Sequence, residues 1–332
     1  MENKLQKHIL LKGDCPLHYY TSEWKEDGIT LVLVHGIAVD HHSYDQLIEC
    51  LPEDRYNILA MDMRAHGKSQ PNDEKLTKEL LLEDILDVLE KAEVEKAIFI
   101  GQGLGGALIQ EILFQHPEMV QALGILGAAC SFGRISMAER ISYGIMSTVV
   151  STYRFDKLRQ NVSFSNSARV EGREYTHRCI TKMEKKELVT LLKMSTKMTH
   201  YEKDYKSEVP GFSALGVLNV ESSVEKINSV YQNCLPNVDC YRIVGCASIV
   251  QYDAPEQVAE LLQRMYLKMF DPEQYQEVMT KFKEEYEKEM LKELERRRKE
   301  AEKARKRAEE QRKKEAAEKK SKSLFGGLLR KK

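Results

Sequence analysis

The chain has 332 residues, of which 51 are Lys or Arg and 52 are Asp or Glu, so its formal net charge is −1. A balance this close to zero gives no specific sign of nucleic-acid binding. With 42% hydrophobic residues, the chain can bury a sizeable core. The charges are unevenly distributed, because residues 1–270 carry 30 basic and 37 acidic side chains whereas residues 271–332 carry 21 and 15.

The cellular compartment is inferred from what the sequence lacks. Its seven cysteines are scattered and form no C-x-x-C pair, which argues against a disulfide framework and a zinc site. The first residues show no long apolar stretch with a small-residue cleavage site, and no run approaches about 18 apolar residues. We therefore expect a cytoplasmic protein with no metal and no cofactor.

Short apolar runs alternate with helical patterns from residue 6 to about residue 270. This alternation is typical of an α/β protein with a largely parallel sheet, and the continuous hydrophobicity of the runs indicates that both sheet faces are covered. The clearest predicted strands are 30–35, 56–62, 96–101, 120–128, 213–219 and 239–244. The predicted helices are 76–92, 104–115, 224–232 and 255–270.

Residues 131–205 interrupt the alternation with a helix-rich insertion that begins SFGRISMAERISYGIMSTVVSTY. We interpret this insertion as a helical cap over the sheet, which either shapes a ligand pocket or only packs against the core. The sequence thus divides into a core formed by residues 1–130 and 206–270, a cap formed by residues 131–205, and a C-terminal arm formed by residues 271–332.

The arm has an unusual composition. Between residues 281 and 320, 17 of 40 residues are Lys or Arg and 12 are Glu, with no Gly or Pro. Glu residues four positions before Lys or Arg favour a long solvated helix. A single charged helix is preferred over a coiled coil, because apolar heptad positions are not sustained. The end after Glu318 is basic and partly apolar, so it either contacts a protein partner or an anionic membrane surface, or forms a frayed solvated terminus.

Three loops, each directly after a predicted strand, carry recognisable motifs: His35-Gly36, Asp62-Met63-Arg64-Ala65-His66-Gly67-Lys68-Ser69 and Gly101-Gln102-Gly103-Leu104-Gly105-Gly106. Their order and spacing resemble the H-G oxyanion loop, the D-x-R-G-H-G-x-S loop and the G-x-S-x-G nucleophile elbow of the α/β-hydrolase superfamily of esterases, lipases and epoxide hydrolases. The resemblance covers residues 6–270. It implies an α/β-hydrolase fold with a mostly parallel central sheet and a helical cap. The long charged C-terminal helix is expected from composition alone and lies outside the resemblance.

The resemblance also shows where the catalytic triad is degenerate. The nucleophile position holds Gly103, which has no nucleophilic atom. Glu221 aligns with the acid position, although it reads equally well as a solvated loop residue. The histidine position holds Ser248, and no histidine follows His200 in the chain. A general base after the last core strand is therefore excluded in any register.

Other candidate sites are weaker. Asp40, His41 and His42 follow the oxyanion loop, but we predict a surface loop there because adjacent histidines diverge and no third ligand is spaced to join them. Cys130 and Cys246 lie near the expected rim of the sheet, and without a cationic neighbour they are predicted to be inert.

The backbone N–H groups of Ile37 and Leu104, with the Gly36 turn before them, can still bind a small carbonyl or carboxylate ligand at the start of the following helix. The sequence therefore favours a catalytically silent ligand- or protein-binding module. The alternative is an active hydrolase for a small ester, amide or lipid-like substrate that uses an unrecognised nucleophile or a displaced histidine such as His200.

Overall fold

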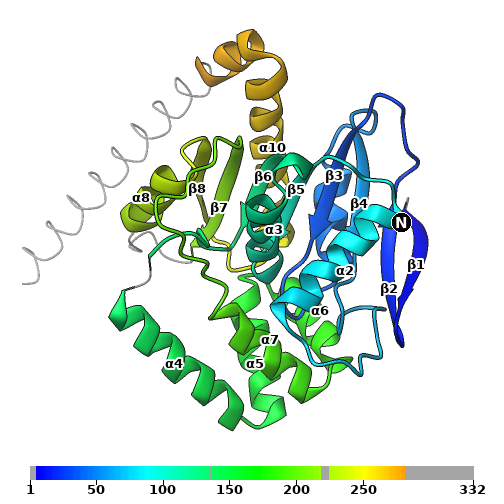
Figure 1. Cartoon of the computed structure of the whole chain (residues 1–332), viewed down its shortest axis with the longest axis vertical. Helices are drawn as coiled ribbons and strands as arrows, with labels where there is room; N and C mark the ends of the chain where they lie inside the picture. The colour runs from blue at the N-terminus through cyan, green and yellow to red at the C-terminus, as the bar shows by residue number, and fades with distance from the viewer. Residues whose placement is uncertain (1–4, 135, 218–223, 281–332) are drawn as a thin grey trace, which may run out of the picture. The chain divides into compact units, whose positions relative to one another are not determined.

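The computed structural model describes residues 5–134, 136–217 and 224–280, and it contains one eight-stranded sheet with the order β1-β2-β4-β3-β5-β6-β7-β8 (Figure 1). The pairs β1–β2 and β2–β4 are antiparallel and all other neighbours are parallel. The strands are β1 (Gln6–Lys12), β2 (Cys15–Thr21), β3 (Ile29–Val34), β4 (Tyr56–Met61), β5 (Ala97–Gln102), β6 (Val120–Leu126), β7 (Gly211–Val217) and β8 (Val238–Val244). This architecture confirms the predicted fold class.

Helices cover both faces of the sheet, as the continuous apolar strands require. Side chains alternate along β3, so Val32 and Val34 join one core with α2 (Lys78–Lys91) and α3 (Leu104–Gln115). Leu31 and Leu33 join the other core. That second core also contains residues of α1 (Asp45–Glu49), α9 (Val250–Asp253) and α10 (Pro255–Phe270). All ten predicted strands and helices are present, and their described ends lie within two residues of the predicted bounds.

The antiparallel β1–β2 hairpin was not among the predicted strands. β1 is largely exposed and has the sequence QKHILLK, in which only three consecutive residues are apolar, so it lacks the longer apolar runs that mark the central strands. β2 is buried, and it pairs with β4 between Tyr19↔Met61 and Thr21↔Leu59. The pairing that fixes the hairpin is thus formed with a strand about 40 residues later in the chain.

Four helices lie between β6 and β7 and form the region predicted as the cap: α4 (Met137–Thr152), α5 (Phe155–Asn166), α6 (Val170–Thr181) and α7 (Lys185–Ser195). They lie together at one end of the sheet (Figure 1). α5 packs extensively on α6, and α4 contacts α7. Only Val150 of α4 is buried, so this helix is the most exposed of the four.

The chain divides into two compact units, Met1–Met269 and Phe270–Lys332. In the second unit, residues 272–280 are helical. The predicted charged helix and coiled-coil alternative fall mainly on residues 281–332, which lie outside the described residues. Among the described residues, no helix is long and apolar enough to cross a membrane. The short helices η1 (His41–Tyr44) and η2 (Pro117–Met119) and the helix α8 (Val224–Cys234) complete the assignment.

Candidate functional site

The turn between β5 and α3 has the geometry of a strand-to-helix elbow. Gly103 has φ 53° and ψ −114°, and its N–H donates to the carbonyl of Leu126. Positive φ costs an L-residue energy, which a glycine avoids. A Cβ on Gly103 would be 3.9 Å from the nearest atom, Gly36 Cα, so the space above the turn is open. The neighbouring Gly105 is needed for a different reason, because a Cβ there would lie 2.2 Å from the carbonyl oxygen of Val34.

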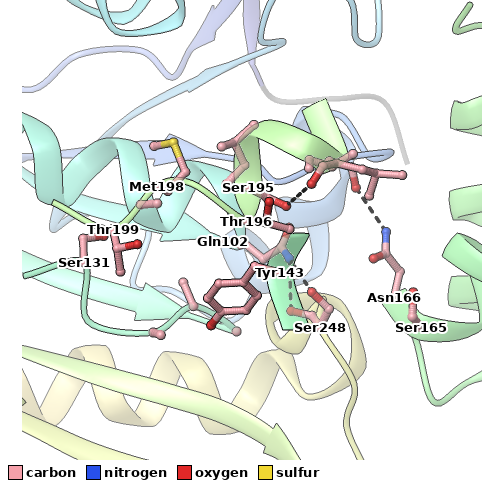
Figure 2. A pocket seen from close by; sticks show the side chains of 18 of the residues that line it. Gln102, Ser131, Tyr143, Ser165, Asn166, Ser195, Thr196, Met198, Thr199 and Ser248 are labelled. Carbon is pink, nitrogen blue, oxygen red and sulfur yellow. Dashed lines mark hydrogen bonds between the residues drawn. The ribbon is translucent and has the colours of Figure 1, made fainter. Parts of the chain in front are cut away.

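Gln102 links the elbow to the loop that carries Ser248. Its Nε2 donates to the Ser248 carbonyl oxygen at 3.1 Å and to Ser248 Oγ at 3.0 Å (Figure 2). The carbonyl acceptor fixes which end of the Gln102 amide is the nitrogen. Gln102 Oε1 is buried and has no hydrogen-bond partner. It packs so closely on Gly36 that a Cβ on that residue would lie only 2.2 Å from this oxygen. The structure thus brings the predicted nucleophile and histidine positions side by side, through a residue that the sequence did not single out.

The oxyanion loop is held by side chains from the sheet and from the cap. His35 Nδ1 donates to the Gly36 carbonyl oxygen at 2.7 Å, and His35 Nε2 accepts from the Met63 N–H at 2.9 Å. Burial lowers the pKa of His35, which favours the neutral ring that this pair of bonds needs. From the end of α5, Asn166 Nδ2 donates to the Ile37 carbonyl oxygen at 3.1 Å. Asn166 also accepts the Ile249 N–H on its own carbonyl, so it joins two loops of the site.

A buried, hydrogen-bonded pair formed by His41 and Asp62 lies beside this loop. Asp62 Oδ1 accepts from His41 Nδ1 at 2.7 Å and from the His41 N–H at 3.0 Å, while Oδ2 accepts from the Lys68 N–H at 2.9 Å. Tyr20 donates to Oδ2 and stacks on the His41 ring. Burial by itself raises the pKa of Asp62, but the hydrogen bonds from His41 and the electrostatic interaction with that ring outweigh it and hold the pKa far below its ordinary value.

This arrangement corrects the surface-loop prediction for residues 40–42. Asp40 and His41 are buried, and only His42 is exposed. Asp40, His41 and Asp62 each offer one ligand atom within 4.8 Å of the others, so a third group does join them, supplied by the chain just after β4. Both Asp62 oxygens already accept protein hydrogen bonds, and Asp40 accepts from Tyr175 and from the His42 N–H. The three groups therefore form a hydrogen-bonded network, and the absence of a metal stays a prediction.

A cavity of about 380 Å³ opens above Gly103 between the sheet and the cap. Among the described residues, none of those that line it is charged and none is a histidine. The lining includes Ile37 and Leu104, which were predicted to bind a ligand, and Ser248, which was predicted at the histidine position. Gly36, the third predicted ligand-binding residue, lies directly behind Gln102. Hydroxyl and amide side chains from the core and the cap surround the space: Gln102, Ser131, Tyr143, Ser165, Asn166, Ser195, Thr196 and Thr199 (Figure 2).

The substitute catalytic groups considered from the sequence are engaged elsewhere or poorly nucleophilic. His200 Nδ1 lies 3.2 Å from both carboxylate oxygens of Glu111, the ring packs on Phe114, and the residue does not line the cavity. Cys130 does line it, but burial raises the pKa of its thiol to about 12. Burial also raises the pKa of Cys246 to about 11. Thiols with such values are protonated at neutral pH.

One predicted site residue, Glu221, has no place in the described structure, and two residues of the site, Gln102 and Asn166, were not predicted from the sequence. Glu221, at the acid position, lies outside the described residues. Gln102 is visible in the motif, but its hydrogen bonds to Ser248 join segments 146 residues apart, and the local pattern carries no sign of them. Asn166 carries no local signal, because it meets Ile37 only across 129 residues of chain.

The comparisons with known proteins agree with this geometry. The sequence profile of the alpha/beta hydrolase fold family matches residues 29–212. The rat bifunctional epoxide hydrolase 2 is 33% identical over 121 residues, which are 36% of this chain and 21% of that protein. The Escherichia coli esterase YbfF is 32% identical over 103 residues, which are 31% and 40% of the two chains.

A solved structure of a hydrolase from Pseudomonas aeruginosa superposes with a TM-score of 0.65 at 16% identity, covering 78% of this chain and 98% of that one. The curated relatives match over less than half of their own length, so they support the family and not a particular activity. With the profile match spanning more than half of the chain and the same fold in the solved hydrolase, this protein belongs to the alpha/beta hydrolase fold family.

Proposed function

We propose that this protein is a catalytically silent member of its family that binds a small ligand in the cavity above Gly103. The observation that carries the proposal is the elbow itself, where the backbone conformation at the nucleophile position is present and the nucleophile is not. Ser248, at the histidine position, accepts a hydrogen bond from Gln102 and offers no base of suitable pKa. Without a nucleophile and a base, the residual catalysis of such a site is several orders of magnitude below that of ordinary enzymes.

The chemistry of the cavity supports a carbonyl or carboxylate ligand that also carries a hydrogen-bond donor. Leu104 is the first residue of α3, so its N–H has no partner within the helix and can donate to a ligand oxygen. The hydroxyl oxygens of Ser165, Ser195 and Thr196, which line the cavity, can accept from a hydroxyl or N–H group on the ligand. An uncharged lining gives no counter-ion for a cationic ligand.

The competing proposal is an active hydrolase with a non-standard nucleophile. It is supported by the names of the relatives, which include an esterase and an epoxide hydrolase. Purified protein should be treated with a fluorophosphonate probe and with chromogenic esters of short acids. The silent-binder proposal predicts no covalent labelling and no turnover above a heat-denatured control, and labelling or turnover would reject it.

Binding itself is tested by thermal shift with a panel of small hydroxy-carboxylates and their neutral amides. A ligand of the cavity should raise the melting temperature of the wild type and leave Thr196→Trp unshifted, because Thr196 lines the cavity and the indole would fill it. Thr190→Trp is the matched control, on α7 but outside the lining. Equal shifts in both variants would place the ligand elsewhere.

A further inference from the structure

The cap exposes an unusual amount of apolar surface. Nine of the fourteen exposed large hydrophobic side chains among the described residues belong to residues 131–205. Most of them lie on α4, where Met137, Ile141, Ile145 and Val149 follow one another at intervals of four residues and are 70%, 58%, 60% and 37% exposed. Residues four apart lie on one face of a helix, so these side chains form a continuous ridge about 18 Å long. Met146, 54% exposed, widens the ridge.

Such a ridge differs from the scattered apolar residues of an ordinary protein surface. Isolated exposed side chains are normal, whereas a contiguous apolar face indicates a surface that is covered in use. α4 is otherwise well formed as a helix, since Ser136 and Glu139 make a reciprocal capping box at its start. It lies at the edge of the group of cap helices in Figure 1, on the side away from α6.

Charge indicates what covers the ridge. The cap carries 14 basic and 8 acidic residues, a net charge of +6, while the rest of residues 1–270 carries 16 and 29, a net charge of −13. Three exposed arginines lie on α4 or flank it along the chain: Arg134 before α4, Arg140 within it and Arg154 just after it. The acidic residues between positions 134 and 156 are two, Glu139 and Asp156. Two caps that met through this face would bring like charges together, whereas an anionic surface would attract them.

We propose that α4 is an interfacial helix that binds the surface of an anionic phospholipid bilayer, with the Met137–Val149 ridge in the acyl boundary and the arginines at the headgroups. Apolar burial and attraction to anionic lipid together drive the binding of such helices. Tyr143, on another face of α4, lines the cavity, so membrane binding would place the lipid surface next to the ligand site. The proposal does not depend on whether the cavity is catalytic.

The test is co-sedimentation of the full chain with vesicles of phosphatidylcholine alone or with added phosphatidylserine. Wild-type protein should bind the anionic vesicles more strongly, and the difference should shrink at high salt. Ile141→Gln with Ile145→Gln should weaken binding by about tenfold or more, because two apolar side chains are removed from the interface. The matched control is Ile9→Gln with Leu11→Gln, which removes two exposed apolar side chains from β1 and should bind like the wild type.

The arginines are tested separately. Arg134→Gln, Arg140→Gln and Arg154→Gln should each reduce binding to anionic vesicles by about fivefold and leave binding to neutral vesicles unchanged. Circular dichroism and thermal unfolding establish that each variant is folded. The proposal is overturned if the wild type does not bind anionic vesicles, or if the α4 double variant binds as well as the β1 control, which would assign binding to another part of the chain.

Sedimentation velocity tests the alternative that a second copy of this chain, and not a lipid surface, covers the ridge. If the wild type dimerises and Ile141→Gln with Ile145→Gln makes it monomeric, the ridge is an interface between two copies and the lipid proposal is wrong. A monomeric wild type with α4-dependent vesicle binding supports the proposal.

Discussion

Gly103 combines the backbone conformation of a nucleophile elbow with the absence of any side-chain atom. Its φ of 53° is costly for a residue with a Cβ, and the surrounding close contacts of Gly105 and Gly36 hold the turn in place. In an active enzyme this strain would accompany a serine that performs chemistry. Here a glycine relieves the strain, which is consistent with a site that retains the shape of the elbow for binding.

Replacement of Gly103 by serine should therefore reduce stability without restoring activity. The side chain has room, so the cost is the positive φ, and we expect a loss of about 1–3 kcal/mol in the free energy of unfolding. Thermal unfolding measures this change. Gly144→Ser is the control, since Gly144 lies on exposed α4 with no atom within 4 Å, and its melting temperature should stay level or rise slightly. An unchanged melting temperature for Gly103→Ser would contradict the elbow geometry.

The buried His41–Asp62 pair predicts an acid-sensitive contribution to stability. Asp62 has a folded-state pKa below its ordinary value of 3.8, so the charged form is favoured by folding. The contribution is complete above about pH 4 and is lost as the pH falls towards the lower folded-state pKa. Asp62→Asn should lower stability at pH 7 by about 3–5 kcal/mol, because His41 loses a buried charged partner. It should also flatten the acid limb of the stability curve.

Urea unfolding at a series of pH values tests this prediction. Asp45→Asn is the matched control, because His42 and Asp45 form the same kind of pair at 2.8 Å but both are exposed. Its effect should be at most about 1 kcal/mol, since water and salt screen the interaction. If both variants lost the same stability, burial would not be the factor that strengthens the His41–Asp62 pair.

At the scale of elements, α3 and α4 show what the local sequence can and cannot predict. The bounds of α3 follow from its apolar pattern and the glycine before it, and ten of its twelve residues are buried. The sequence of α4 is also apolar, with Met, Ile and Val at helical spacing, and such a pattern usually predicts a face packed on the core. In the structure its main apolar row faces solvent, because the contacts of α4 are made mostly through Val150 and the side that meets α7.

The difference in burial predicts different local stability. Amide hydrogens of α4 should exchange at least about tenfold faster than those of α3, because an exposed helix with few apolar contacts opens locally at low cost. Hydrogen exchange with mass spectrometry on lipid-free protein measures both helices in one experiment. Equal protection would mean that α4 is covered in solution, as in a dimer.

At the scale of the whole molecule, the net charge of −1 conceals one acidic region and two basic regions. The core is acidic, and both the cap and residues 271–332 are basic. Bulk charge therefore says little about partners, whereas the distribution of charge over the fold supports the proposal that the cap binds an anionic surface. The two compact units meet in sequence near residue 270, close to the change in composition.

Limited proteolysis tests the division into units. Trypsin should first remove the segment after the first unit and leave a resistant fragment that retains Met1–Met269, because buried and hydrogen-bonded backbone resists cleavage. The cap serves as an internal control, since its 75 residues contain 14 Lys and Arg residues and so also offer many potential cleavage sites. Early cleavage within residues 131–205 would indicate that the cap is the less stable part.

The sequence by itself determined the fold class, the succession of the central strands and helices along the chain, and the residues Gly103 and Ser248 at the positions expected for a nucleophile and a histidine. These features are local: apolar periodicity, glycine-rich turns and the residue type at one position can be read along the chain. The tertiary structure decided the rest. Gln102 beside Gly36 and Ser248, Asp62 joined to His41, Asn166 bound to Ile37, and the outward face of α4 all depend on contacts between distant segments, and an isolated sequence pattern does not contain the geometry that forms those contacts.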